Sequence, residues 1–148
     1  MNVTAKDLRW LQACEALAPL FSTCDRRQYA AFIVDPNGRV VGFGYNGSPP
    51  GHPHCGDAPC PRLHSDVTPG SPYDSGTGRC IAVHAEANAL LYSDTNARQG
   101  GTLYVNGPPC PDCAKLIVAA GISRIVHTAN PAYPDACTPL GIHTTAVQ

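Results

Sequence analysis

The chain has no surplus of positive charge, and charged residues of either sign are scarce. Ten Lys and Arg residues stand against eleven Asp and Glu residues, which gives a formal net charge of −1 at pH 7. Proteins that bind nucleic acid usually carry a clearly basic face, because they neutralise phosphates with Lys and Arg. The charge balance therefore argues against a nucleic-acid partner.

Long hydrophobic runs are absent as well. No stretch of about 18 consecutive apolar residues occurs, so no membrane-spanning segment is expected. The segment Met1–Trp10 has no basic region followed by an apolar region, which predicts no secretory signal. We therefore expect a cytoplasmic protein. With 148 residues and no visible internal boundary, we expect a single domain over residues 1–148.

Proline and glycine, by contrast, are abundant, with 15 and 14 residues. Many of the prolines lie between Gly47 and Arg79, where the chain shows little hydrophobic periodicity. A loop of this length inside a compact domain is uncommon and is usually functional. We therefore expect this segment to form part of a site.

Hydrophobic periodicity and turn residues divide the rest of the chain into helices and strands. Thr4 and Asp7 resemble a capping box at the start of the first helix, and Pro19 is expected to end or kink it. The pattern predicts helices over 4–21, 81–94 and 112–120, and strands over 29–34, 39–45, 102–105, 124–128 and 141–147. A hairpin followed by alternating strands and helices indicates an α/β fold with a mixed sheet covered by helices.

Two short motifs contain the residue types of a metal site. They are His84-Ala85-Glu86 and Pro109-Cys110-Pro111-Asp112-Cys113. Together they form the H-x-E…P-C-x-x-C signature of the zinc-dependent nucleobase deaminases. A catalytic zinc keeps three protein ligands and one open position. We predict that His84, Cys110 and Cys113 bind a catalytic Zn²⁺.

Glu86 follows the histidine by two residues, so it emerges near the metal without having to bind it. We predict that it is the catalytic residue that moves protons from the attacking water to the ring nitrogen and the leaving amine. A lone C-x-x-C also occurs in structural zinc sites and redox pairs, and a lone H-x-E carries little information. The two motifs in this order, each at a predicted helix start, are far more specific.

With these motifs the chain resembles the cytidine and deoxycytidylate deaminase superfamily, and most closely the deoxycytidylate (dCMP) deaminases and the related competence-type proteins. The resemblance also rests on Gly44-Tyr45-Asn46-Gly47-Ser48-Pro49 and on Ala120-Gly121-Ile122. It extends from about Cys24 to His127. It implies a three-layer α/β/α fold with a mixed five-stranded sheet, a homo-oligomer, and regulation by deoxycytidine and thymidine triphosphates.

The resemblance also implies substrate contacts. Asn46 should bind the nucleotide sugar or base through hydrogen bonds, and the backbone around Ala85 should hold the pyrimidine carbonyl. The position of Asn46 agrees, because a side chain with donor and acceptor at the end of a strand can face a ligand. The alternative is an ordinary Asn-Gly turn residue.

Relatives of this group can carry a second zinc, and four further cysteines stand in fitting positions. They are Cys24, Cys55, Cys60 and Cys80, with His52, His54 or His64 able to replace one of them. Four thiolates form a closed, structural site, and the alternative is a set of unpaired loop thiols. The candidate partners for a substrate phosphate are Arg26, Arg27, Arg62 and Arg79.

The leading hypothesis is therefore hydrolytic deamination of dCMP to dUMP, with release of ammonia, in pyrimidine nucleotide metabolism. The first alternative is a deaminase of another aminated base, such as cytidine, a modified cytosine nucleotide, guanine or a tRNA adenosine. The absent basic surplus disfavours tRNA. The second alternative is a non-catalytic zinc-binding module, against which Glu86 argues because a structural site needs no proton shuttle.

Overall fold

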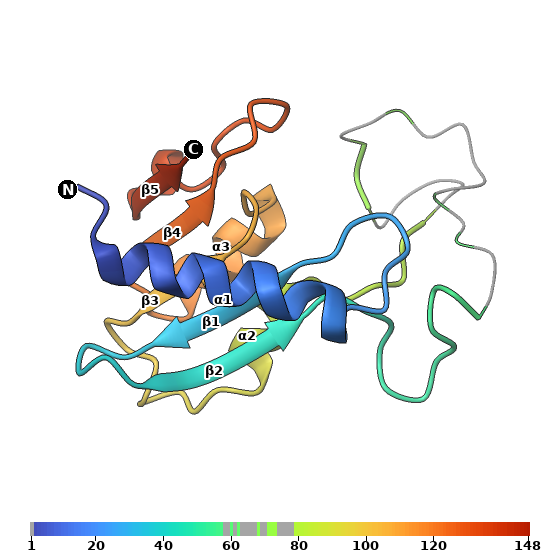
Figure 1. Cartoon of the computed structure of the whole chain (residues 1–148), viewed down its shortest axis with the longest axis horizontal. Helices are drawn as coiled ribbons and strands as arrows, with labels where there is room; N and C mark the ends of the chain where they lie inside the picture. The colour runs from blue at the N-terminus through green and yellow to red at the C-terminus, as the bar shows by residue number, and fades with distance from the viewer. Residues whose placement is uncertain (1, 58–59, 61, 63–67, 69–70, 74–78) are drawn as a thin grey trace.

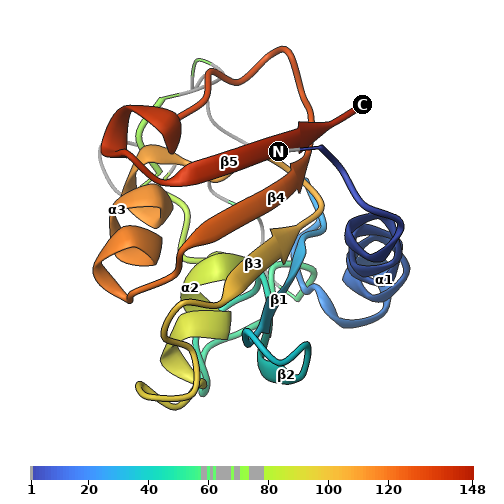
Figure 2. The ribbon, with the colours of Figure 1, turned by 90° about the vertical axis from the view of Figure 1, so that its left-hand side faces the viewer.

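A central mixed sheet carries helices on both of its faces (Figures 1 and 2). The computed structural model describes residues 2–57, 60, 62, 68, 71–73 and 79–148. Its elements are α1 (Ala5–Phe21), β1 (Ala30–Val34), β2 (Val40–Tyr45), α2 (Ala85–Leu91), β3 (Thr102–Val105), α3 (Pro111–Ala119), β4 (Arg124–Thr128), the short 3₁₀ helix η1 (Thr138–Leu140) and β5 (His143–Val147). The predicted three-layer α/β/α fold with a mixed five-stranded sheet is confirmed.

The strand directions bring several chain segments to one edge of the sheet. The strands lie in the order β2-β1-β3-β4-β5. β1 pairs antiparallel with both β2 and β3, whereas β3, β4 and β5 are parallel. The start of β1 therefore lies at the same edge as the ends of β2, β3 and β4. Loops at this edge are in position to form a common site.

Each face of the sheet has its own hydrophobic cluster. Along β1, Ala31 and Ile33 pack toward α2 and α3, while Phe32 and Val34 pack toward α1. This alternation is the period of two that a strand imposes on its side chains. α1 lies alone on its face (Figure 2). None of the helices in the described ranges is long and apolar enough to cross a membrane.

The first helix begins at the predicted cap. The Thr4 hydroxyl accepts a hydrogen bond from the Asp7 amide at 3.1 Å, and the Asp7 carboxylate accepts one from the Thr4 amide at 2.9 Å. The helix continues past Pro19 to Phe21, the predicted last residue, so of the two expected effects of the proline, ending the helix does not occur. Pro19 lies in the last turn, where the loss of one backbone hydrogen bond has little effect on the rest of the helix.

The helix predicted over 81–94 is much shorter in the structure. α2 covers Ala85–Leu91 only. Val83 instead forms an antiparallel bridge with Gly47, through two backbone hydrogen bonds of 3.1 and 2.8 Å. Pairing with the segment after β2 thus outweighs the helical tendency of this Ala-rich stretch, since propensity is a weak term against tertiary contacts.

Candidate active site

Two helix N-termini meet at the carboxyl edge of β3. His84 is the N-cap of α2, and Cys110 is the N-cap of α3, whose first residue is Pro111 as predicted. The close approach of α2 to β2 depends on Gly44, because a Cβ there would lie 2.3 Å from the Ala85 carbonyl oxygen. The local sequence therefore positions both ligand-bearing helix starts on one side of the sheet.

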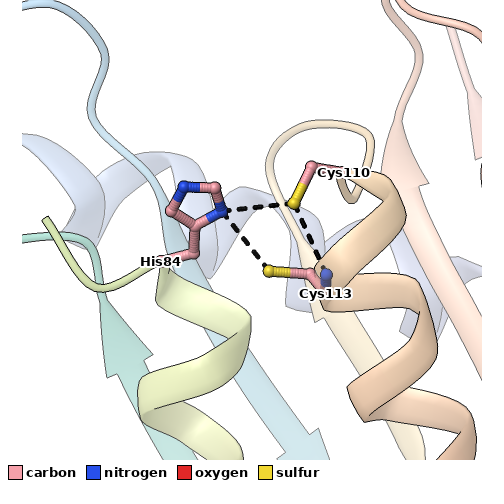
Figure 3. A group of neighbouring side chains, drawn as sticks. All are labelled: His84, Cys110 and Cys113. Carbon is pink, nitrogen blue, oxygen red and sulfur yellow. Dashed lines mark hydrogen bonds between the residues drawn. The ribbon is translucent and has the colours of Figure 1, made fainter. Parts of the chain in front are cut away.

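The three predicted ligands are in contact (Figure 3). His84 Nδ1 lies 3.4 Å from the sulfur of Cys110 and 3.4 Å from the sulfur of Cys113. Bond lengths of about 2.3 Å for Zn–S and 2.0 Å for Zn–N give S···N separations of about 3.5 Å in a tetrahedral site. Both S···N separations therefore match those of a zinc site.

The pKa values of the three predicted ligands are shifted in different directions. Hydrogen bonds from Cys113 and His84 lower the pKa of Cys110 to about 4. The pKa of Cys113 is raised, because its hydrogen bond to Cys110 and its burial both favour the thiol. The hydrogen bond with Cys110 also raises the pKa of His84. Zinc binding requires both sulfurs as thiolates, so the site releases its thiol proton when the cation binds.

Glu86 lies in the first turn of α2 and is only 6% exposed. Burial raises the pKa of its carboxyl, and the neighbouring His84 offsets part of that increase. A carboxyl whose pKa is raised toward neutrality can both accept and donate a proton, as general acid–base catalysis requires. Glu86 therefore has the surroundings of a proton-transfer group.

A cavity of about 240 Å³ opens beside these groups. His84, Glu86 and Cys110 form part of its lining. The remaining lining comes from the segments before β1 and after β2, β3 and β4, because these strand ends share one edge of the sheet. It includes Arg26, Arg27, Tyr29, Asn46, Tyr73, Gly107, Pro108, Ala132 and Tyr133.

Asn46 lines the cavity but already has several partners. Its side-chain oxygen accepts hydrogen bonds from the Tyr29 amide at 2.8 Å and the Ser22 hydroxyl at 2.6 Å. Its Nδ2 donates to the Arg27 carbonyl at 2.7 Å. Asn46 therefore holds the segment before β1 against the cavity, and the second N–H of its amide can serve a ligand.

The other predicted substrate contact is less direct. Ala85 is fully buried, and the described residues that line the cavity do not include it. The proposed contact of the backbone around Ala85 with a pyrimidine carbonyl stays a prediction.

The four cysteines predicted to bind a second zinc form no compact group of ligand atoms among the described residues. Cys55 and Cys60 are buried, and Cys24 and Cys80 are half-buried. Burial raises the pKa of Cys55, and the thiols of the other three add to this effect. Within the described residues, His84, Cys110 and Cys113 form the only group of three or more His, Cys, Asp or Glu side chains whose ligand atoms lie within 4.8 Å of one another. The second zinc therefore stays a prediction, and His64 lies outside the described residues.

The structure separates the four candidate phosphate partners. Arg26 and Arg27 line the cavity. Arg62 is buried and donates hydrogen bonds to the carbonyls of Ser71 and Pro72. Arg79 is exposed and is not among the described lining residues.

Sequence reasoning missed three tyrosines of the cavity, Tyr29, Tyr73 and Tyr133. The guanidinium of Arg27 lies over the ring of Tyr133, 4.7 Å from its centroid. The signal for Tyr133 was an aromatic residue between two prolines just after a strand, in a loop at the edge that carries the motifs. The contact itself joins segments far apart in the chain, and no local pattern predicts it.

This fold, with a Cys₂His site and a buried carboxyl group at one cavity, defines a zinc-dependent hydrolase of the nucleobase-deaminase class. The chain matches the family model for the cytidine and deoxycytidylate deaminase zinc-binding region over residues 4–129. The chain belongs to the cytidine and deoxycytidylate deaminase family.

Named relatives agree with this assignment. The chain is 50% identical over 107 residues to a deoxycytidylate deaminase of Mycobacterium phage D29. This aligned region covers 72% of this chain and 81% of the relative. It is 34% identical over 113 residues to the deoxycytidylate deaminase of Schizosaccharomyces pombe. This aligned region covers 76% of this chain but 34% of the yeast protein. The chain thus spans most of the phage relative and about a third of the yeast relative.

A solved structure has the same fold. It is the crystal structure of dCMP deaminase from the cyanophage S-TIM5 in complex with dCMP and dUMP. The TM-score is 0.74 with 25% sequence identity, over 99% of this chain and 100% of that chain.

Proposed function

We propose that the chain is a zinc-dependent deoxycytidylate deaminase, which converts dCMP and water to dUMP and ammonia. One observation above all supports this: Glu86 and two of the three metal-binding side chains, His84 and Cys110, line the same cavity. The phage relative that is 50% identical carries this name, and the solved neighbour is bound to dCMP and dUMP.

The proposed chemistry divides between the metal and one carboxyl group. His84, Cys110 and Cys113 would hold the zinc, which supplies a Lewis acid and lowers the pKa of a water molecule. Glu86 takes a proton from the attacking water and delivers it to the N3 atom of cytosine. It then takes the second proton of that water from the new C4 hydroxyl group and delivers it to the exocyclic amine. A C4–O bond forms, the C4–N bond breaks, and ammonia leaves.

We assign the substrate phosphate to Arg26 and Arg27. Among the described lining residues these are the two arginines. Guanidinium groups bind phosphate oxygens with charge-assisted, often bidentate, hydrogen bonds. Tyr133 supports Arg27 from one side through its ring. A nucleoside without a phosphate would leave both cations unpaired.

The test is ammonia release from a panel of dCMP, deoxycytidine, CMP, cytidine and guanine. We expect dCMP to have the highest kcat/KM. In Arg27→Ala the KM for dCMP should rise about 10- to 100-fold, because a hydrogen bond to a charged group contributes about 1.5–3 kcal/mol. Turnover of deoxycytidine should stay unchanged. Arg39→Ala, an exposed arginine before β2, is the matched control. Turnover of cytidine with no activity on dCMP would reject the proposed substrate.

The second zinc is a separate proposal, in which Cys24, Cys55, Cys60 and Cys80 bind a structural ion. The proposal is supported by Cys55, whose pKa is raised in part by the thiols of the other three cysteines. Elemental analysis should give two zinc ions per chain, and Cys55→Ser should retain one with the deaminase activity. One zinc per chain in the unmodified protein would remove this site.

We also propose a cytoplasmic homo-oligomer that binds deoxycytidine and thymidine triphosphates as effectors. Exposed apolar side chains at the end of α2 and on α3 support the oligomer, since Leu91 and the C-cap residue Tyr92 are each 70% exposed and Leu116 is 50% exposed. Light scattering should give a mass of several chains. Each triphosphate should change the dCMP concentration at half-maximal rate.

A further inference from the structure

Arg62 is a buried cation with an unusual set of partners. It is 6% exposed, although it belongs to the long proline-rich segment. Its two terminal nitrogens donate to backbone carbonyls, of Pro72 at 3.1 Å and of Ser71 at 2.7 Å. None of the ion pairs among the described residues involves Arg62. Its Nε also has no hydrogen-bond partner among them. Burying a charge is costly, so the contacts that Arg62 does make contribute to holding it in place.

Among the residues that the structure describes, Tyr73 provides an aromatic contact to Arg62. The guanidinium carbon of Arg62 lies over the ring of Tyr73, 4.5 Å from its centroid. Such cation–π contacts are stronger when the cation is shielded from water. The Tyr73 carbonyl also accepts a hydrogen bond of 2.7 Å from the Cys80 amide, four residues before His84. Arg62 therefore fixes the side chain of Tyr73, and Cys80 fixes its backbone.

Tyr73 in turn contacts the metal-binding histidine. The Tyr73 ring and the His84 imidazole have centroids 4.8 Å apart and are nearly perpendicular, at 86°. This is a favoured edge-to-face arrangement. Tyr73 also lines the cavity, so it forms a side wall beside the metal site. A metal-ligating histidine needs its ring orientation fixed by surrounding groups.

We propose that Arg62 and Tyr73 are positioning residues for the zinc ligand His84. Arg62 holds Tyr73 in place, and the Tyr73 ring holds the His84 imidazole with Nδ1 toward the two cysteine sulfurs. In this proposal both residues act through His84. The assignment also gives Arg62 a role other than phosphate binding, because its terminal nitrogens are bonded to the chain.

The first test measures zinc retention. The zinc-loaded protein is mixed with a coloured chelator, and the rate of zinc transfer is recorded. Substitutions around metal ligands typically change metal affinity about 10- to 100-fold, so Tyr73→Ala should speed zinc transfer about tenfold. Tyr73→Phe should stay within about twofold of the unmodified protein, because it keeps the ring. Tyr73→Leu keeps apolar bulk but lacks the ring, and it should behave like Tyr73→Ala.

The arginine variants test the route through Tyr73. Arg62→Ala and Arg62→Lys should both speed zinc transfer about tenfold, since Lys cannot bond two carbonyls and stack on a ring in the same way. The exposed Arg39→Ala is the matched control and should have no effect. The double variant Arg62→Ala/Tyr73→Ala should transfer zinc no faster than Tyr73→Ala alone, because residues that act as one unit are not additive.

The kinetic arm rests on the proposed function. In the same variants kcat/KM for dCMP should fall about tenfold, mainly through kcat, and Tyr73→Phe should restore it. If the protein does not deaminate dCMP, the zinc-transfer experiment still tests the positioning role. Zinc transfer by Tyr73→Leu or Arg62→Lys within about twofold of the unmodified protein would overturn the proposal. Additive effects in the double variant would overturn the route through Tyr73.

Discussion

Two carboxyl groups, those of Asp7 and Glu86, are buried on opposite faces of the same sheet. They are 1% and 6% exposed. Asp7 lies in α1, and Glu86 lies in the first turn of α2. Their surroundings differ, and the comparison separates a carboxylate that holds the fold together from a carboxyl that is available for chemistry.

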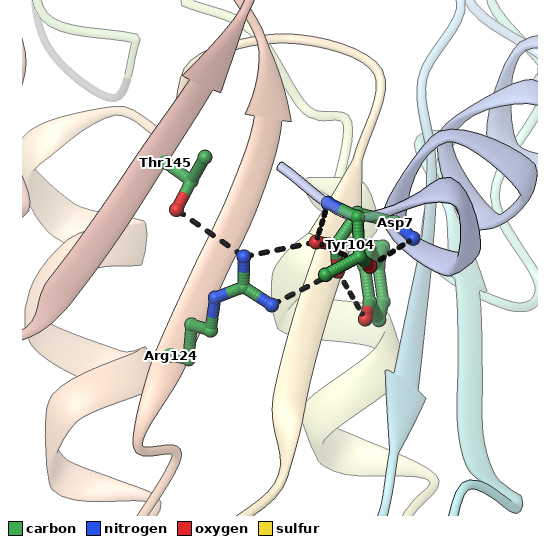
Figure 4. Close-up of polar contacts among 5 residues, drawn as sticks. Asp7, Tyr104, Arg124 and Thr145 are labelled. Carbon is green, nitrogen blue, oxygen red and sulfur yellow. Dashed lines mark hydrogen bonds and ion pairs between the residues drawn. The ribbon is translucent and has the colours of Figure 1, made fainter. Parts of the chain in front are cut away.

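Asp7 is surrounded by donors (Figure 4). Arg124 binds both of its oxygens, at 2.9 and 3.0 Å, and the Tyr104 hydroxyl donates to it at 2.9 Å. The amide and the hydroxyl of Thr4 each donate to it at 2.9 Å. Burial acts to raise its pKa, but these hydrogen bonds together hold the pKa well below its usual range. Asp7 therefore stays ionised and ties α1 to β3 and β4.

For Glu86 the effect of burial on the pKa outweighs the effect of its neighbours. Burial is the largest influence on its pKa and raises it, and the offset by His84 is incomplete. Environments that push the pKa values of two carboxyls apart distinguish acid–base groups from ionised structural groups. The comparison teaches that burial alone does not assign a role. The number and charge of the donors around a carboxyl decide it.

The largest expected effect is at the metal ligands beside Glu86. Cys113→Ala should abolish zinc binding at this site and reduce ammonia release to background, because three protein ligands are needed for an open catalytic site. The folded state should persist, which circular dichroism can check. Deamination by this variant without bound zinc would break the assignment of Glu86 to a metal-assisted reaction.

Glu86→Gln should lower kcat by about 10²- to 10⁴-fold, the usual contribution of a general acid–base group. Gln keeps the size of the side chain but cannot carry the proton. Zinc content, measured on the same sample, should be unchanged. A zinc-loaded variant with nearly unmodified turnover would show that Glu86 is not the proton carrier.

Asp7→Asn should leave the kinetics nearly unchanged and lower the free energy of unfolding by about 3 kcal/mol, since it leaves the half-buried Arg124 without its counter-charge. Urea unfolding at pH 7 gives this value. Glu86→Gln in the zinc-free protein should cost nothing or stabilise slightly, because it removes a group whose ionised form is disfavoured by burial. Equal destabilisation by both substitutions would break the comparison.

The smallest expected effect is the pH dependence of the unfolding free energy that Asp7→Asn loses. A carboxyl with a lowered pKa in the folded state contributes stability that is fully present above its unfolded pKa of about 3.9. The contribution is lost as pH falls toward the folded-state value. The gap in unfolding free energy between the unmodified protein and Asp7→Asn should therefore be constant above about pH 5 and shrink below about pH 4. A gap independent of pH would contradict the ion pair.

The metal site could be predicted from the sequence because its residues form two pairs, and the members of each pair lie close together in the chain. His84 and Glu86 are two residues apart, Cys110 and Cys113 are three residues apart, and helix starts fix the directions of both pairs. The hairpin and the parallel strands were also predictable, since turn residues and apolar runs bound them. The start of α2 was not, because Val83 pairs with Gly47, a distant segment that no local pattern reveals.

The cavity walls were less predictable for the same reason. The contacts of Arg62 with Tyr73 and of Arg27 with Tyr133 join segments whose relative positions depend on the whole fold. The sequence offered four arginines of equal standing, and the structure places Arg26 and Arg27 at the cavity, buries Arg62 and leaves Arg79 exposed.

The most direct test of the central claim follows zinc and ammonia together. The protein is stripped of metal with a chelator, reloaded with zinc, and supplied with dCMP. We predict one molecule of ammonia released for each dUMP formed, no release from the stripped protein, and recovery on addition of zinc. Zinc bound at His84, Cys110 and Cys113 with no ammonia released from dCMP would contradict the account.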